Sequence, residues 1–69
     1  MKLSARNVLK GRVVEVVRGA TTAHVKIDIG SATVITASIT NEAVGELKLV
    51  NGDVAYAVIK ASDVMVAKD

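Results

Sequence analysis

Two short clusters of polar side chains, one near each end of the chain, are the residues best suited to chemistry. The first is Ser4-Ala5-Arg6-Asn7 and the second is Lys60-Ala61-Ser62. Serine hydroxyls, backbone N–H groups, Arg and Lys donate hydrogen bonds and supply positive charge, and a dianion removed from water requires both. No acidic residue interrupts either cluster. The clusters therefore favour oxyanion binding, although the same residue types also occur on ordinary protein surfaces.

Catalysis and direct metal coordination have little support. His24 is the only histidine and the chain has no cysteine, whereas a zinc site takes three or four such ligands. The seven carboxylates are scattered singly, without the spacing of a calcium loop or of a catalytic pair. We therefore expect no enzyme, no coordinated metal cation and no cofactor. The carboxylates are Glu15, Asp28, Glu42, Glu46, Asp53, Asp63 and Asp69.

Length and composition predict one small β-rich domain, residues 1–69. Hydrophobic residues make up 51% of the chain, and Tyr56 is the only aromatic residue. A domain of this size buries a small core and usually needs a second source of stability. Disulfides are excluded by the absence of cysteine, so we expect a homo-oligomer.

The same composition argues against nucleic acid and membrane partners. Proteins that bind single-stranded nucleic acid stack bases on aromatic side chains beside a basic groove, but this chain has one aromatic residue and a net charge of only +2. No apolar run approaches the roughly 20 residues of a membrane helix. Polar residues interrupt the first ten positions, which is unlike a signal peptide. We expect a cytoplasmic protein.

Alternation of apolar and polar residues predicts a meander of three strands in the first half of the chain. Thr22–Ile29 has the clearest pattern, with Ala23, Val25, Ile27 and Ile29 on one face. His24 lies on the opposite, polar face. Turn residues at Arg18-Gly19 and Gly30-Ser31 separate this strand from its neighbours. The other two expected strands are Leu9–Val17, in which Gly11 marks a bend, and Ala32–Ile39.

The second half predicts a short helix followed by two strands. Thr40 or Asn41 can cap a helix over Glu42–Leu47, with Ala43, Val44 and Leu47 facing the core. Asn51-Gly52-Asp53 is a turn signal. Strands are expected over Val54–Ile59 and Val64–Val66. This order fits an all-β, OB-like five-stranded Greek-key barrel with one short helix, and an SH3-like barrel is the alternative.

Four segments of the chain resemble the molbindin (Mop) family of molybdate-binding proteins. They are SARN at 4–7, LKGRVVEV at 9–16, ITNEAVGEL at 39–47 and VIKASDVMV at 58–66, and they occur in the order of that family. The resemblance spans the chain. The same domain is similar to the molybdate-sensing part of molybdate-responsive transcription regulators and to the accessory domain of molybdate-importer ATPase subunits.

The resemblance implies a hexamer, described as a trimer of dimers, that binds molybdate or tungstate between subunits. Carried over residue by residue, it implies that Ser4 and Arg6 contact the anion, that Ala5 and Asn7 shape their loop, and that Thr40 adds a hydroxyl. Lys60, Ala61 and Ser62 would close the site. A second anion site is expected at the Arg18-Gly19-Ala20-Thr21 turn, which as a plain hairpin turn needs no ligand. Some relatives carry a hydroxyl residue where this chain has Ala43.

Reversible anion binding for storage or homeostasis is the function these observations favour. One alternative is a molybdate-responsive interaction module that presents a surface to a protein partner in molybdenum metabolism. An OB-type nucleic-acid binder is a further alternative, which the near absence of aromatic residues disfavours.

Overall fold

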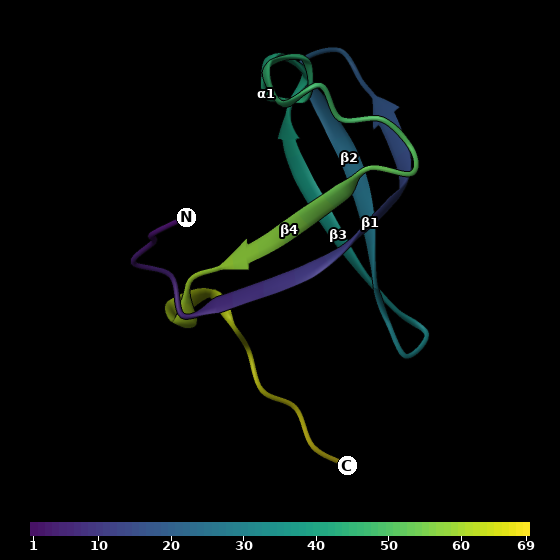
Figure 1. The fold of residues 1–69 in the computed structure, drawn as a ribbon. Helices are drawn as coiled ribbons and strands as arrows, with labels where there is room; N and C mark the ends of the chain where they lie inside the picture. The colour runs from purple at the N-terminus through teal and green to yellow at the C-terminus, as the bar shows by residue number, and fades with distance from the viewer.

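The β-branched run near the N-terminus forms the longest strand, and the remaining strands pair on either side of it. The computed structural model describes all residues 1–69 (Figure 1). Its sheet is antiparallel, with the strand order β3-β2-β1-β4. The elements are β1 (Asn7–Arg18), β2 (Thr22–Gly30), β3 (Thr33–Thr40), α1 (Asn41–Leu47), β4 (Val54–Ile59) and the 3-10 turn η1 (Ala61–Asp63).

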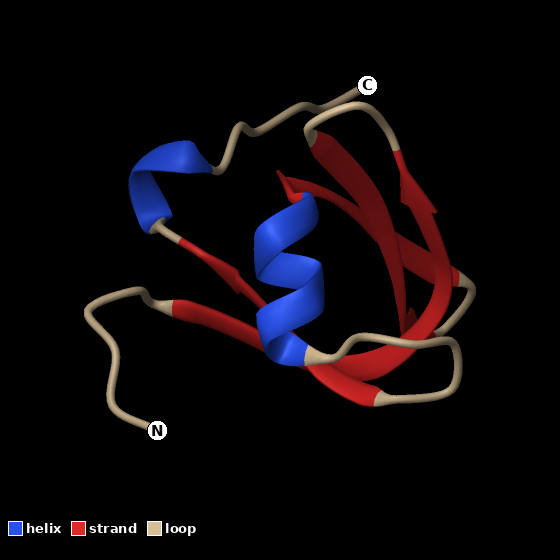
Figure 2. Cartoon of the chain, turned by 90° about the horizontal axis from the view of Figure 1, so that it is seen from above, coloured by secondary structure: helices blue, strands red, loops and turns tan.

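Strand β1 bends because its two halves pair with different strands. Residues 7–12 pair with β4 and residues 12–18 pair with β2, so Arg12 has a neighbour on each side. The register with β2 shifts between Val13 and Glu15, which marks a β-bulge. A Cβ on Gly11 would lie 2.5 Å from the carbonyl oxygen of Asp28. Glycine at this position therefore lets β2 approach closely, and the sheet curls into the half-barrel seen in Figure 2.

The hairpin between β2 and β3 begins at Gly30 as expected, but its turn is one residue longer, so β3 begins at Thr33. Gly30, Ser31 and Ala32 have φ values of 95°, 53° and 58°, and the Gly30 N–H donates a 2.8 Å hydrogen bond to the Asp28 carboxylate. Ala32 therefore belongs to the left-handed turn, and the expectation that it opens the third strand was wrong. The expected inward face of β2 is confirmed, since Ala23, Val25 and Ile27 are buried.

Helix α1 closes one end of the half-barrel. Thr40 caps it, as its hydroxyl oxygen accepts a 3.0 Å hydrogen bond from the Ala43 N–H. Lys48 ends it in the left-handed conformation with φ 52°. Val44 is buried as expected, but Leu47 is 65% exposed, which corrects its assignment to the core. A helix of seven residues presents only a narrow stripe to the sheet, and Val44 fills it.

Six residues form the core, which is as small as the composition predicts. Partly buried side chains such as Leu9, Ile35 and Ile39 pack around them. Neither the helix nor the 3-10 turn has the length to traverse a lipid bilayer. The core residues are Val13, Ala23, Val25, Ile27, Val44 and Ala57.

The expected fifth strand, Val64–Val66, is absent from the single chain. After η1 the backbone is extended but unpaired, and the side chains of Met65 and Val66 are 95% and 93% exposed. Strand propensity reflects packing on a sheet, and a segment without a neighbouring edge forms no ladder. Here η1 directs the chain away from the sheet (Figure 1). The single chain therefore forms a four-stranded half-barrel with one short helix, and the fifth strand of the expected OB-like barrel is not confirmed.

Replacing Gly11 by Ala should destabilise the fold, because the new methyl group would meet the Asp28 carbonyl and the Ile27 side chain. We expect a loss of about 1–3 kcal/mol, as for other overpacked sites. Gly45→Ala is the matched control: apart from its chain neighbours and the backbone of its own helix, no atom lies within 4 Å of its Cβ position, so helix propensity should stabilise the variant by up to about 1 kcal/mol. Urea unfolding at equal chain concentration measures both, and equal effects would contradict the close approach at Gly11.

Candidate functional site

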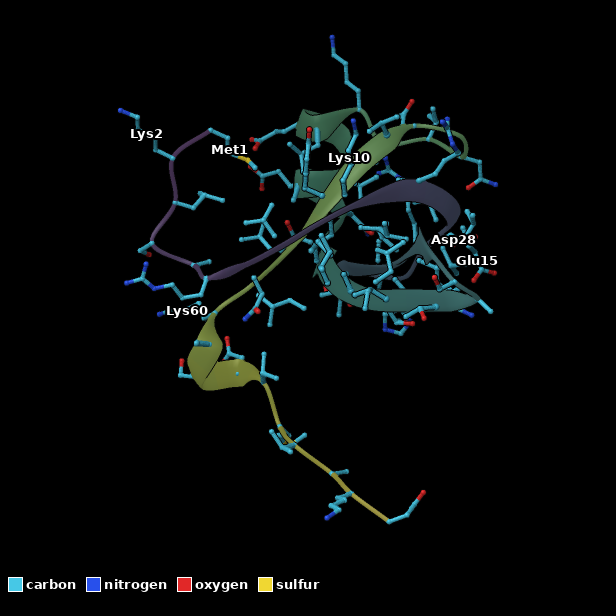
Figure 3. All side chains as sticks on the ribbon, turned by 60° about the horizontal axis from the view of Figure 1, so that its bottom comes forward. Met1, Lys2, Lys10, Glu15, Asp28 and Lys60 are labelled. Atoms are coloured by element: carbon cyan, nitrogen blue, oxygen red, sulfur yellow. The ribbon has the colours of Figure 1, made fainter.

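Pairing between β1 and β4 brings the two polar clusters together. Asn7, the first residue of β1, is the register partner of Ile59, the last residue of β4. The Asn7 side-chain amide also donates a 3.2 Å hydrogen bond to the Ile59 carbonyl oxygen. The loop before β1 and the residues after β4 therefore meet at one end of the sheet, where Figure 3 shows Lys60 beside the start of β1.

The donors of this cluster are exposed and unused. The side chains of Ser4, Arg6, Lys60 and Ser62 take part in none of the hydrogen bonds of the chain. The single ion pair, Lys26–Glu15 at 3.2 Å, lies elsewhere, on β1 and β2. Two cations and two hydroxyls thus remain available to an anion.

Backbone groups add to these donors. In η1 the first hydrogen bond within the turn is donated by the Asp63 N–H to the Lys60 carbonyl at 2.9 Å. The N–H groups of Ala61 and Ser62 precede it, so the turn itself does not use them. Asp63 follows Ser62 directly but forms no ion pair with Arg6 or Lys60. The arrangement suits a tetrahedral oxyanion, which accepts hydrogen bonds from several directions.

Thr40 lies at the opposite end of β1 from this cluster. It is the register partner of Thr22, close to where β2 begins, whereas Asn7 lies at the far end of β1. Its hydroxyl oxygen accepts from the Ala43 N–H, which leaves the O–H group free to donate. A single chain therefore does not bring Thr40 to the two polar clusters.

The Arg18–Thr21 turn, where a second anion site was expected, packs against the start of α1. The Asn41 N–H donates to the Thr21 carbonyl at 2.9 Å, and the Asn41 amide donates to the Gly19 carbonyl at 2.9 Å. The sequence predicts Asn41 only as an alternative helix cap, and no pattern in it predicts this contact between distant segments. Its buried Oδ1 has no partner, and being an acceptor it cannot donate to an anion. Arg18 remains the only cation of this turn.

The remaining polar groups form no further site. His24 is exposed on β2, in register with Ser38 of β3 and Val17 of β1. No three His, Asp or Glu side chains are grouped closely enough to hold a metal ion. The geometry thus concentrates its free donors at the end of the sheet where β1 begins.

Comparison with known proteins matches the whole fold to one family. The TOBE domain model covers residues 3–66. The chain is 52% identical over 66 residues to the probable molybdenum-pterin-binding protein of Haemophilus influenzae, covering 96% of each protein. Among solved structures, the molybdate-binding protein of Sporomusa ovata superposes with a TM-score of 0.92 at 40% identity, covering 99% of this chain and 100% of that one.

A second solved structure contains this fold as part of a longer chain. The cytoplasmic molybdate-binding protein ModG, with molybdate bound, matches with a TM-score of 0.90 at 48% identity. The match covers 94% of this chain and 46% of ModG. These relatives are binding proteins by name. The chain therefore belongs to the TOBE-domain family and, within it, to the molbindins that its sequence resembles.

Proposed function

We propose that this protein binds molybdate, and also tungstate, reversibly and without catalysis, as a cytoplasmic store or buffer. The observation that carries the proposal is the pairing of Asn7 with Ile59, which places two uncommitted cations, Arg6 and Lys60, at one end of the sheet. Support comes from relatives that are named as molybdate-binding proteins, one of them with the anion bound. The ligand residues are Ser4, Ala5, Arg6, Asn7, Thr40, Lys60, Ala61 and Ser62.

The complete site is formed between subunits of a homohexamer arranged as a trimer of dimers. Two features support this. The cluster on one chain is exposed, and interactions between exposed charges are screened by water and salt. Thr40 ends β3 at the end of the sheet where β1 also ends, far from Arg6. It therefore reaches an anion at Arg6 only from another copy. Burial between subunits would exclude water and strengthen every charge-assisted hydrogen bond.

A site whose groups all donate hydrogen bonds would select molybdate and tungstate over sulfate and phosphate. Molybdate and tungstate have the same charge as sulfate but are larger, so fixed donors spaced for the larger ions would meet the oxygens of sulfate poorly. Phosphate at neutral pH often carries a proton that needs an acceptor. Where every group that faces the anion donates to it, that proton has no partner, at a cost of about 1–3 kcal/mol.

Calorimetric titration with sodium molybdate tests the proposal directly. We expect saturable binding that persists in a large excess of sulfate, with a defined ratio of anions to chains. At a free concentration of 100 times Kd, binding stabilises the folded state by about 2.7 kcal/mol, so the thermal midpoint should rise as well. Equal affinity for sulfate and molybdate would exclude the proposed selectivity, and the absence of both heat and thermal shift would exclude binding.

Neutralising either cation should weaken the affinity for molybdate. Charge-assisted hydrogen bonds contribute about 1.5–3 kcal/mol, so Arg6→Gln and Lys60→Gln should each raise Kd by about 10- to 100-fold. Lys26→Gln removes the same charge from β2 and breaks only an exposed ion pair, so its Kd should stay near that of the unmodified protein. If all three variants lose affinity equally, the effect is one of net charge and the assigned site is wrong.

Substitutions at Thr40 separate its cap from its contact with the anion. Asp and Asn both cap helices as well as Thr, so Thr40→Asp and Thr40→Asn should keep the stability of the fold. A carboxylate repels the anion, whereas the amide still donates a hydrogen bond. We expect Thr40→Asp to lower the affinity by at least about 10-fold, equivalent to 1.4 kcal/mol, and Thr40→Asn to retain most of it. Unchanged binding in Thr40→Asp would remove this residue from the site.

A further inference from the structure

The turn before β4 joins an asparagine to a glycine at the surface. Asn51 and Gly52 are both exposed, and Gly52 has a φ of 94°. The Asp53 N–H donates a 3.1 Å hydrogen bond to the Val50 carbonyl oxygen. These features define a type II turn, whose second central position requires the positive φ that glycine adopts freely. The Asn51 side-chain amide takes part in none of the hydrogen bonds of the chain, so it is free to react.

An asparagine that precedes a glycine can react with its own backbone. The Gly52 backbone nitrogen can attack the Asn51 side-chain carbon Cγ, because glycine has no side chain to block the approach. A bond forms between this nitrogen and Cγ, the bond from Cγ to Nδ2 breaks, and Nδ2 leaves as ammonia with the proton of the Gly52 N–H. Water then opens the succinimide ring at either of its carbonyl carbons, which yields aspartate or isoaspartate in place of Asn51.

In the folded chain the attacking nitrogen is held by β1. The Gly52 N–H donates a 2.8 Å hydrogen bond to the Val13 carbonyl oxygen, and the Val13 N–H donates to the Asp53 carbonyl oxygen at 2.8 Å. Val13 is only 1% exposed and belongs to the core. The Arg12 guanidinium adds a 2.6 Å hydrogen bond to the Gly52 carbonyl oxygen. Since the Gly52 nitrogen must lose its proton to attack, its hydrogen bond to Val13 has to open first.

We propose that Asn51 is a modification site of this protein, deamidated at a rate set by how often the turn at Gly52 detaches from Val13. Local openings of this kind occur without global unfolding. The reaction requires water and no other reagent. Each event replaces an amide by a carboxylate and lowers the formal net charge of +2 by one. The turn lies at the opposite end of β4 from Lys60, so the reaction does not depend on which anion the protein binds.

Isoaspartate at this position also loosens the attachment of the turn to β1. Its backbone runs through the former side chain and so contains an additional CH2 group before Gly52. Gly52 and Asp53 hold Val13 through a pair of backbone hydrogen bonds, and the longer backbone cannot keep both without displacing the turn. Val13 is among the largest fully buried side chains of the core. Modification of an exposed turn therefore lowers the stability of the fold.

Peptide mapping by mass spectrometry measures the rate at each asparagine. The full chain is incubated at slightly alkaline pH, folded in sodium chloride or unfolded in guanidinium chloride of equal concentration. We expect Asn51 to convert at least about 10-fold more slowly in the folded chain, because its hydrogen bonds must open first. In the unfolded chain Asn7 and Asn41, which precede Val8 and Glu42, should react more slowly than Asn51. Equal rates at Asn51 in both states, or no conversion in the folded chain, would overturn the proposal.

Arg12→Gln tests whether the contacts of the turn control the rate. The variant loses the guanidinium contact with the Gly52 carbonyl oxygen. We expect Asn51 to convert about 3- to 10-fold faster in the folded variant and at an unchanged rate in the unfolded one. Lys10→Gln is the matched control, since it removes the same charge from the same exposed face of β1 and its side chain forms no hydrogen bond or ion pair. Equal acceleration by both variants would assign the effect to charge and exclude control by the turn.

Unfolding of the modified chains tests the consequence for the fold. Ion-exchange chromatography enriches the chains that have gained a carboxylate, and peptide mapping identifies the fraction with isoaspartate. Urea unfolding at equal chain concentration compares this fraction with the unmodified chain and with Asn51→Asp, which carries the same charge without the additional CH2 group. We expect a lower urea midpoint for the isoaspartate chains and an almost unchanged midpoint for Asn51→Asp. Isoaspartate chains as stable as the unmodified protein would contradict the attachment of the turn to Val13.

Discussion

The rest of the structure depends on the bent pairing of β1 with two neighbours. Arg12 is in register with Asp28 of β2 on one side and with Val54 of β4 on the other. A flat sheet would not let β2 and β4 share this strand and still face a common core. The bulge after Val13 and the close approach at Gly11 supply the curvature. Without that bend, Val13, Val25 and Ala57 would not meet in one cluster.

The same pairing builds the candidate site. Because β4 is in register with the first half of β1, the chain segments that flank this pair must lie at a common end. Two clusters separated by more than fifty positions in the sequence thereby become neighbours. Their cationic and hydroxyl side chains stay exposed on the surface. The register of β1 with β4 thus determines which residues meet at the candidate site. Its cations remain exposed, and the relatives that bind molybdate share this fold at 40–48% identity.

Contact with another copy of the chain would address three features together: the small core, the exposed candidate site and the open sheet. Six buried residues give limited stability to a chain of 69. An anion held by exposed donors competes with water, and an unpaired sheet edge invites association. Such contact would bury apolar surface and would exclude water from a bound anion. Stability, binding and assembly are then linked by mass action, since a ligand bound only by the assembly favours the assembly.

The sequence by itself determined the local elements. Alternation gives the inward face of β2 and the limits of β4. Turn chemistry gives the turn at Asn51-Gly52-Asp53, and side-chain hydrogen bonding gives the cap at Thr40. It also identified both polar clusters by residue type. Tertiary structure decided what depends on distant partners. The pairing of Asn7 with Ile59 brought the two clusters together. Thr40, at the end of β3, lies at the other end of the sheet. Val64–Val66 pairs with no strand of its own chain. A strand needs a neighbour, and spacing along one chain does not reveal where that neighbour lies.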